Sequence, residues 1–381
     1  MFKKIFILAF IFTCCVSCKK DSDFDKIPPD QFLTGNRGFS GSEDGILMAA
    51  EWNDLKNWDF WKNFIDTSEY KNQMNIWGIY PQTKYEFILN NNSGSPLVDL
   101  KTNLISVNNQ IVWTTRSDSK GNVLLWNNFF SNNGNPHQIS INLDNSVSTL
   151  QPSRFEEGIK INYAIDWTVL QSNLIEIAFV FDVTASMDSL KKYFESNLPA
   201  IIQDSEINQN GYLLRTACVF YKDHDEDFLL RKSDFKQDLT ITMQQIINQQ
   251  TGGGGDYPEA MDEALLEAIN KLSWSDKAFS RIIFLMTDAP PHQNSQNISN
   301  IQKLIVDANA KGIRIIPITQ TGVATETEIL FRMIAMATKG TYVFVLNDAI
   351  QTTPDRITMG QIYPEKLNTL VSKILKDFIA P

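Results

Sequence analysis

Three oxygen-bearing side chains follow a strongly apolar stretch near the middle of the chain. The segment Ile175 to Phe181 carries a single charge, and such a run is typical of a strand buried on both faces of a parallel sheet. Asp182, Thr184 and Ser186 come directly after it. Their hard oxygen donors suit Mg²⁺, Mn²⁺ or Ca²⁺ rather than zinc. Because open α/β sheets bind ligands at the carboxyl ends of their strands, we predict a divalent-cation site here.

Two later segments place further acidic side chains at the same edge. Four successive glycines, Gly252 to Gly255, come before Asp256 and Glu259, and glycine lets the backbone approach a ligand closely. Asp288 follows another apolar strand, which we predict over Arg281 to Met286. Carboxylates gathered at one edge repel one another, and a divalent cation would remove that cost.

Two other interpretations of these residues have to be considered. A glycine-rich turn before a helix is also typical of phosphate binding, but Asp256 and Glu259 would repel a phosphate and the basic residue of a Walker loop is missing. Alternatively, Asp182 and Asp256 cap helices while Asp288 belongs to a turn. We favour the cation site, because three carboxylates at one edge are costly without a counter-charge. Even so, Asp256 followed by Pro258 predicts the start of a helix.

The residues from Asp182 to Ser186 resemble the first motif of von Willebrand factor type A domains, in which D-x-[ST]-x-S begins a metal-ion-dependent adhesion site. The segment GGGD-x-PE resembles the second motif of one branch of that family. The commoner branch has Gly-Gly-Thr, with the threonine on the ion. Asp256 stands at that position here, and Thr251 is a second candidate.

The resemblance implies roles for the other residues. Asp288 takes the place of the last acidic residue of the site, which usually acts through water. Gly253, Gly254 and Gly255 would form the ligand loop together with Glu259. The implied cofactor is a divalent cation, Mg²⁺ in the first place, with Mn²⁺ or Ca²⁺ as alternatives. An acidic side chain of a protein partner would complete the coordination.

The elements expected around these residues form an α/β domain over residues 174–380. Strands and helices alternate, which predicts a doubly wound, mostly parallel, Rossmann-like sheet. Besides the strands already named, we expect strands at 213–221, 313–319 and 342–346, and an antiparallel edge strand near 227–230. The expected helices span 188–202, 240–250, 297–310, 325–338 and 364–379.

Residues 84–166 predict a different architecture, an antiparallel β-sandwich domain. Hydrophobicity there alternates with a period of two between turns rich in Asn, Gly and Ser. The turn at Gly94, Pro96 and Leu97, followed by Asp118, Gly121 and Leu124, resembles transthyretin-like or prealbumin-like sandwiches of bacterial surface proteins. Modules of that kind mostly act as spacers or docking platforms.

The segment 45–83 is rich in aromatic residues and is expected to be helical. Apolar side chains recur at helical spacing from Asp54 to Phe64. An aromatic cluster can line a carbohydrate or peptide groove, but it more often forms core, and we favour core here. We therefore treat residues 45–83 as a segment separate from the sandwich domain that follows.

The first eighteen residues resemble a bacterial lipoprotein signal peptide. Lys3 and Lys4 precede a short apolar stretch, and Val16-Ser17-Cys18 resembles a lipobox. We expect Cys18 to be lipidated and residues 19–44 to act as a tether. The protein would then belong to the bacterial cell envelope, at the outer membrane or the cell surface, with the lipid as its membrane anchor. An ordinary signal peptide with incidental cysteines is the alternative.

Composition limits the classes of function. The chain has 381 residues, 43% of them hydrophobic, and a formal net charge of −10, which argues against a nucleic-acid partner. Beyond the leader the only cysteine is Cys218, in an apolar run, so we expect a buried thiol and no disulfide framework. The acidic run from Tyr221 to Asp227 could bind a second ion or repel acidic partners, but we favour a solvated hairpin turn.

These observations favour a cell-surface lipoprotein that binds a partner through the cation site and is not an enzyme. A metal-dependent hydrolase or phosphoryl-transfer enzyme is one alternative, although Thr184 stands where a haloacid-dehalogenase-type phosphatase needs a second Asp. A purely structural metal site is the other alternative.

Overall fold

The computed structural model describes residues 46–130, 135–144, 146–152, 161–167, 171–255, 257–346 and 359–380. Every described residue belongs to one compact unit, Glu43–Pro381. The predicted leader with Cys18, the tether 19–44 and Asp256 lie outside the described residues.

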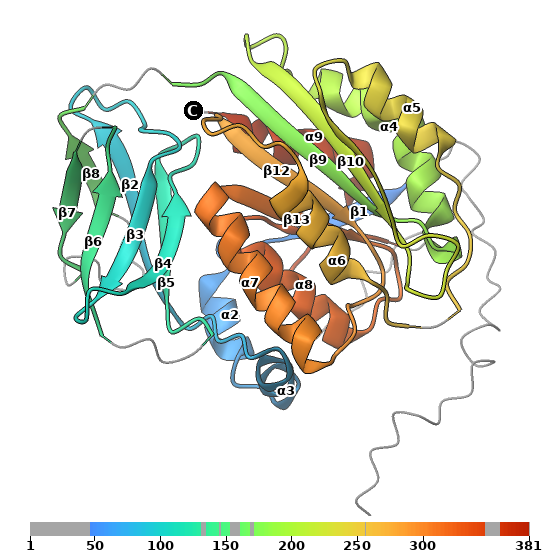
Figure 1. Ribbon diagram of the computed structural model, residues 1–381, viewed down its shortest axis with the longest axis horizontal. Coiled ribbons are helices and arrows are strands. Elements are labelled where there is room, and N and C mark those ends of the chain that lie inside the picture. The colour runs from blue at the N-terminus through green and yellow to red at the C-terminus, as the bar shows by residue number, and fades with distance from the viewer. Residues whose placement is uncertain are drawn as a thin grey trace, which may run out of the picture. The chain divides into compact units, whose positions relative to one another are not determined.

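An eight-stranded sheet forms the centre of the carboxyl-terminal half (Figure 1). Its order is β11-β10-β9-β12-β13-β14-β1-β15. The inner pairs from β10 to β14 are parallel, whereas β11, β1 and β15 pair antiparallel. The predicted α/β class is confirmed, with a mixed sheet. The strands are β1 Met48–Trp52, β9 Leu174–Asp182, β10 Leu213–Tyr221, β11 Leu230–Lys236, β12 Ser280–Met286, β13 Ile313–Thr319, β14 Tyr342–Val345 and β15 Glu365–Lys366.

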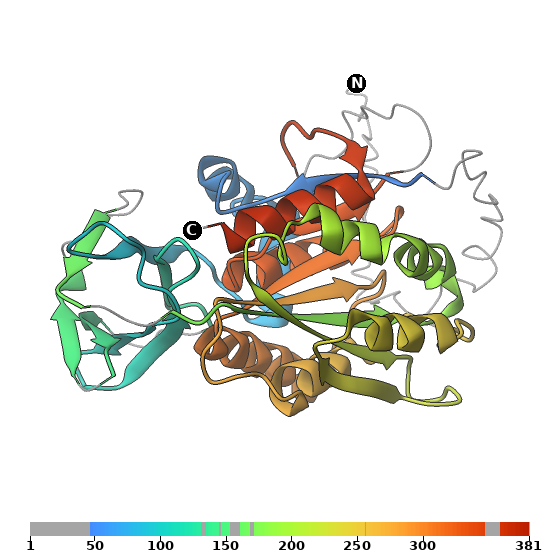
Figure 2. The same ribbon diagram turned by 90° about the horizontal axis from the view of Figure 1, so that it is seen from above.

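Helices cover both faces of this sheet (Figure 2). Two hydrophobic clusters lie on the two faces of the sheet. Along β9, Ile177 and Phe179 belong to one cluster and Ala178 and Val180 to the other, because successive side chains of a strand point to opposite faces. One cluster contains apolar residues of α4 Asp188–Asp204, α5 Leu239–Asn248 and α9 Leu367–Ile379. The other contains those of α6 Met261–Leu266, α7 Ser295–Lys311 and α8 Thr325–Ala337, and a π-helical turn, Glu267–Lys271, continues α6.

The strand β1 comes from a segment for which the sequence predicted only helix. It pairs antiparallel with β14 and also with β15. Its sequence MAAEW shows neither β-branched residues nor a clear alternation, so its pattern does not indicate a strand. Tertiary packing selects it, because Ala49 and Ala50 are fully buried on opposite faces of the sheet.

The aromatic segment that follows is core, as predicted. It forms the helices α2 Trp58–Phe64 and α3 Ser68–Trp77, in which Trp61, Tyr70 and Trp77 are buried. These aromatic side chains surround a buried ion pair between Asp54 and Arg332 of α8, whose side chain is fully buried. Arg332 donates from Nη2 to Asp54 Oδ1 (2.6 Å) and from Nε to Asp54 Oδ2 (3.0 Å). The guanidinium also lies over the rings of Phe64, Trp61 and Trp52.

Residues 83–165 form a β-rich region of two sheets, in agreement with the coarse prediction. One sheet joins β5 Asn122–Asn127, β2 Thr83–Asn91 and β8 Ile161–Ile165. The other joins β4 Ile111–Arg116, β3 Lys101–Ser106, β6 Pro136–Asn142 and β7 Val147–Leu150. The prediction of purely antiparallel strands is wrong for one pair, because β2 and β8 run parallel. The long excursion through the second sheet permits this pairing, which a tight hairpin cannot form.

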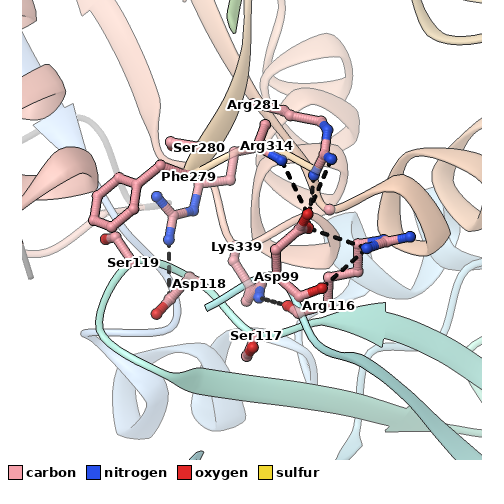
Figure 3. Close-up of a pocket in the computed structure, with 12 residues that line it drawn as sticks. Asp99, Arg116, Ser117, Asp118, Ser119, Phe279, Ser280, Arg281, Arg314 and Lys339 are labelled. Carbon is pink, nitrogen blue, oxygen red and sulfur yellow. Dashed lines mark hydrogen bonds and ion pairs between the residues drawn. The ribbon is translucent and has the colours of Figure 1, made fainter. Parts of the chain in front are cut away.

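The β-rich region contacts the large sheet at the amino-terminal ends of its strands (Figure 3). Arg281, the second residue of β12, donates to Asp99 Oδ1 at 2.7 Å, and Arg314, the second residue of β13, contacts Asp118 Oδ2 at 2.9 Å. Burial raises the pKa of Asp118, but Arg314, Lys339 and the hydrogen bonds from Asn122 together keep that pKa below its usual value. The carboxyl-terminal strand ends lie at the opposite edge.

Within the described part of the chain, none of the helices combines the length and apolar character that crossing a bilayer would require.

The pair Asp54–Arg332 gives a prediction about stability. Replacing Asp54 by Ala leaves a buried guanidinium without its bidentate partner, so we expect the free energy of unfolding to fall by about 3–5 kcal/mol. Asp66→Ala, which removes an exposed partner of Lys71, should change it by less than about 0.5 kcal/mol. Urea denaturation of both variants measures the two effects, and equal effects would contradict this account of the core.

Candidate metal site

The site begins where β9 ends, at the carboxyl edge of the sheet. Asp182 is the last residue of β9 and lies in register with Tyr221, the last residue of β10. On the other side β9 pairs with β12, whose last residue, Met286, is opposite Phe181. Asp288 is therefore only two residues beyond the end of the neighbouring strand. Strand register alone brings the first and third motifs together.

The first motif folds as a tight turn that the side chain of Asp182 closes. Its Oδ1 accepts hydrogen bonds from the backbone nitrogen of Thr184 (2.9 Å) and from Thr184 Oγ1 (2.6 Å). A short 3₁₀ helix, η3 Ala185–Met187, then leads into α4. Neither helix is capped by Asp182, so the interpretation of Asp182 as a helix cap is wrong. This carboxylate turns the chain through its own backbone instead.

Four of the predicted side chains form one continuous set of oxygens. Thr184 donates to Asp182, its Oγ1 lies 3.3 Å from Ser186 Oγ, and Ser186 in turn lies close enough to Asp288 to lower the pKa of that carboxyl. Asp182 and Thr184 are buried, Asp288 is partly buried and Ser186 is exposed. The set therefore leads from the interior of the sheet to the solvent.

One atom of this set lacks a partner. Asp182 Oδ2 is buried and accepts no hydrogen bond from any residue that the structure describes. Buried carboxylate oxygens are normally hydrogen-bonded, because leaving one unsatisfied costs its full desolvation penalty. Such an oxygen is suited to a cation.

The pKa values of both aspartates at this edge are raised, mainly by burial. Burial, and next the charge of Asp288, raise the pKa of Asp182 to about 7, although the hydrogen bonds from Thr184 oppose the shift. Burial likewise raises the pKa of Asp288, against the hydrogen bond from Ser186. The cause in both cases is a charge held in a poorly solvated place without a counter-ion.

The glycine loop lies against the first motif, as its predicted role requires. The nitrogen of Ala185 donates to the carbonyl oxygen of Gly253 (3.2 Å), and the nitrogen of Gly252 donates to the carbonyl oxygen of Val183 (3.0 Å). A Cβ added at Gly254 would lie 2.8 Å from Thr184 Cβ. A side chain at Gly254 would therefore push the loop off the motif.

The remaining loop residues have different surroundings. Glu259 is buried, with Oε1 3.6 Å from the position a Cβ would take at Gly254. Gly255 is exposed. Thr251 donates from Oγ1 to Asp188 Oδ1 (2.6 Å), so its hydroxyl is engaged at the start of α4 rather than at Asp182. Asp256, the other candidate for the second motif, lies outside the described residues.

The helix after the glycine loop starts later than the sequence predicted. The residue before its first turn is Ala260, so the prediction that Asp256 begins the helix, with Pro258 in its first turn, is wrong. The nitrogen of Glu259 donates instead to the carbonyl oxygen of Pro290 (3.1 Å). This bond holds the segment before α6 against the loop of the third motif.

Two neighbours of the site were missed by the sequence analysis. Tyr221 donates from its hydroxyl to Thr287 Oγ1 (2.9 Å), and burial, followed by the charge of Asp182, raises its pKa well above its usual value. Gln320 donates from Nε2 to the carbonyl oxygen of Ser186 (2.8 Å). Gln320 directly follows β13, so a search for polar residues after each strand would have found it.

Among the described residues, no three His, Cys, Asp or Glu side chains lie close enough together to hold a metal ion. These residue types alone therefore do not complete a metal site there. The set at this edge combines two aspartates with two hydroxyls. All of its donors are hard oxygens, which fit Mg²⁺, Mn²⁺ or Ca²⁺.

Comparison with known families agrees with this geometry. Residues 176–348 match the model of the von Willebrand factor A domain. The match begins inside β9 and ends just after β14, so it contains all three loops of the site. It covers less than half of the chain and supports a von Willebrand factor A domain in that part. No curated protein matches the chain.

The raised pKa of Asp182 predicts how the metal-free domain responds to pH. The folded carboxyl has a pKa of about 7 against 3.8 for its usual value, so the folded state holds a proton that the unfolded state has lost. The contribution of Asp182 to stability therefore falls as the pH rises from about 4 to 7, by about 4 kcal/mol in total. Above pH 7 the whole penalty is present.

Asp182→Asn, which keeps an oxygen for Thr184, should therefore stabilise the protein in chelator at pH 8 and change little at pH 4.5. Asp188→Asn is the matched control: the pKa of Asp188 is lowered by Lys192 and Thr251, so its replacement should destabilise at pH 8. Urea unfolding at the two pH values measures both. A destabilised Asp182→Asn protein at pH 8 would contradict the electrostatic account.

Proposed function

We propose that the von Willebrand factor A domain binds a divalent cation and, through it, a protein partner. Asp182, Thr184, Ser186 and Asp288 would hold the ion directly or through water. Asp256 or Thr251 would supply the second motif. The cation would lower the mutual repulsion of the carboxylates and satisfy the buried oxygen of Asp182.

The observation that carries this proposal is Asp182 itself: a fully buried carboxylate with one oxygen lacking a hydrogen-bond partner among the described residues and a pKa raised to about 7. A group in that state is costly to the metal-free fold at neutral pH. Mg²⁺ is the expected ion, and Mn²⁺ or Ca²⁺ could replace it, because all of them prefer oxygen ligands.

A partner would reach this edge without displacing the β-rich region. That region contacts the sheet through Arg281 and Arg314, near the starts of β12 and β13, whereas Ser186 is exposed at the carboxyl edge. An Asp or Glu of the partner is the natural further ligand for such an ion. In this role the chain binds rather than catalyses, and the β-rich region acts as the platform that presents the site.

We further propose that the protein is a lipoprotein of the bacterial cell envelope. Lipidated Cys18 would anchor it, residues 19–44 would act as a tether, and the β-rich region, as a transthyretin-like sandwich, would hold the cation site away from the membrane. The lipobox-like residues 16–18 support this proposal.

Cation binding is tested by thermal and chemical unfolding of the chain without residues 1–18. A divalent cation at one hundred times its dissociation constant should raise the free energy of unfolding by about 2.7 kcal/mol. Asp182→Ala should lose this response, while Asp59→Ala, at an exposed side chain of α2, should keep it. Equal responses from the parent and Asp182→Ala would exclude the site.

Partner binding is tested by cross-linking and recovery of the surface-exposed protein with and without chelator. We expect a captured protein that disappears in chelator and with Ser186→Ala. Capture that persists in both would contradict binding through the ion, and a bound cation with no cation-dependent partner would favour a structural role. Turnover of phosphoester or peptide substrates that depends on Asp182 would favour an enzyme.

The anchor is tested separately by metabolic labelling with a fatty-acid analogue. The parent should carry label and sediment with membranes, whereas Cys18→Ser should carry none and be released from them. Labelling that survives Cys18→Ser would show that another residue is modified.

A further inference from the structure

The loop Lys222–Asp227, called here the acidic loop, lies between the other loops of the site. The sequence analysis interpreted it as a solvated turn, and this is wrong for part of it. Lys222 and Asp223 are buried, whereas Asp225 is exposed. The difference arises because the acidic loop begins at the carboxyl end of β10, where neighbouring loops cover its first residues.

One side chain of the acidic loop reaches the loop of the third motif. His292 Nε2 lies 2.9 and 3.1 Å from the two oxygens of Asp223. His292 is four residues beyond Asp288 in the sequence. The acidic loop is thereby tied to the segment that carries the last acidic residue of the site.

A second side chain reaches the glycine loop. The backbone nitrogen of Gly254 donates a hydrogen bond to Glu226 Oε1. A Cβ added at Gly253 would lie 1.9 Å from Glu226 Oε2, so the carboxylate rests directly on the backbone there. Both glycines have φ +78°, a conformation that other residues rarely adopt.

The glycine loop therefore passes between two surfaces, Glu226 on one side and Thr184 on the other. A side chain at Gly253 would meet the first, and a side chain at Gly254 would meet the second. This explains why successive glycines are needed. It also shows that a residue distant in sequence fixes where the loop lies relative to the first motif.

We propose that Glu226 is a positioning residue that holds the glycine loop against Thr184 and so sets the cation affinity of the site. The inference rests on the proposed function. A loop of four glycines has a large conformational entropy. Ordering such a loop when the cation binds costs free energy and so lowers the affinity for the cation. Glu226 orders the loop beforehand, which is the usual gain from preorganisation.

The test is calorimetric titration of the full chain with Mn²⁺ at pH 7.5. Glu226→Ala removes the acceptor, and we expect the dissociation constant to rise about tenfold or more. Glu226→Gln keeps an acceptor oxygen for Gly254 while losing the charge, and should stay within about threefold of the parent. Asp225→Ala removes an equal charge from an exposed neighbour and should stay within about twofold.

A second measurement reports whether the glycine loop is ordered when no cation is present. Hydrogen exchange in chelator should show the amide of Gly254 protected in the parent, Glu226→Gln and Asp225→Ala, and exchanging faster in Glu226→Ala. A role through charge alone would leave this exchange unchanged. It would also make Glu226→Gln bind the cation as weakly as Glu226→Ala, because both variants lose the same charge at the same position.

The outcomes separate the two proposals. If the parent binds no Mn²⁺, the proposed function fails and the role of Glu226 fails with it. If the parent binds Mn²⁺ and Glu226→Ala binds it equally well, the positioning role alone is overturned. The same holds if Glu226→Gln binds Mn²⁺ as weakly as Glu226→Ala. Tenfold weaker binding by Ala, near-parental binding by Gln and lost protection of Gly254 would support it.

Discussion

The burial of two aspartates at the end of a parallel sheet is the constraint on which the rest of this domain depends. Asp182 lies at the end of β9, and Asp288 lies two residues past β12, its neighbour. The pairing of these strands fixes Asp182 within the sheet and brings the start of the loop that carries Asp288 beside it. Burial raises the pKa of both carboxyls, and the charge of Asp288 further raises the pKa of Asp182.

The surrounding loops can be understood as a response to that constraint. Thr184 satisfies one oxygen of Asp182, and Ser186 lowers the pKa of Asp288, whereas Asp182 Oδ2 has no hydrogen-bond partner among the described residues. Glycine at 253 and 254 lets a further loop lie directly on the first motif. The β-rich region binds the opposite edge through Asp99 and Asp118. The proposed cation and partner would therefore not compete with the β-rich region for the same surface.

Much of the domain could be predicted from its sequence, because buried parallel strands are continuous apolar runs. β10 and β13 have the predicted bounds, and the edge on which Asp182, Ser186 and Asp288 meet follows from strand order. Features that depend on tertiary packing could not be predicted. The strand β1 has no strand pattern, and the parallel pairing of β2 with β8 depends on how two sheets meet. The contact between Glu226 and Gly254 joins loops whose proximity only the fold defines.

The central claim is that the side chains of the first and third motifs bind one cation together. Crystals grown with Mn²⁺ and measured at an X-ray energy where manganese scatters anomalously test it most directly, because the signal locates the ion without reference to the protein atoms. We predict one strong peak within bonding distance of Ser186 and of a carboxylate of Asp182 or Asp288, or of waters held by them. A fully occupied Mn²⁺ elsewhere on the chain, with no peak at this edge of the sheet, would contradict the account.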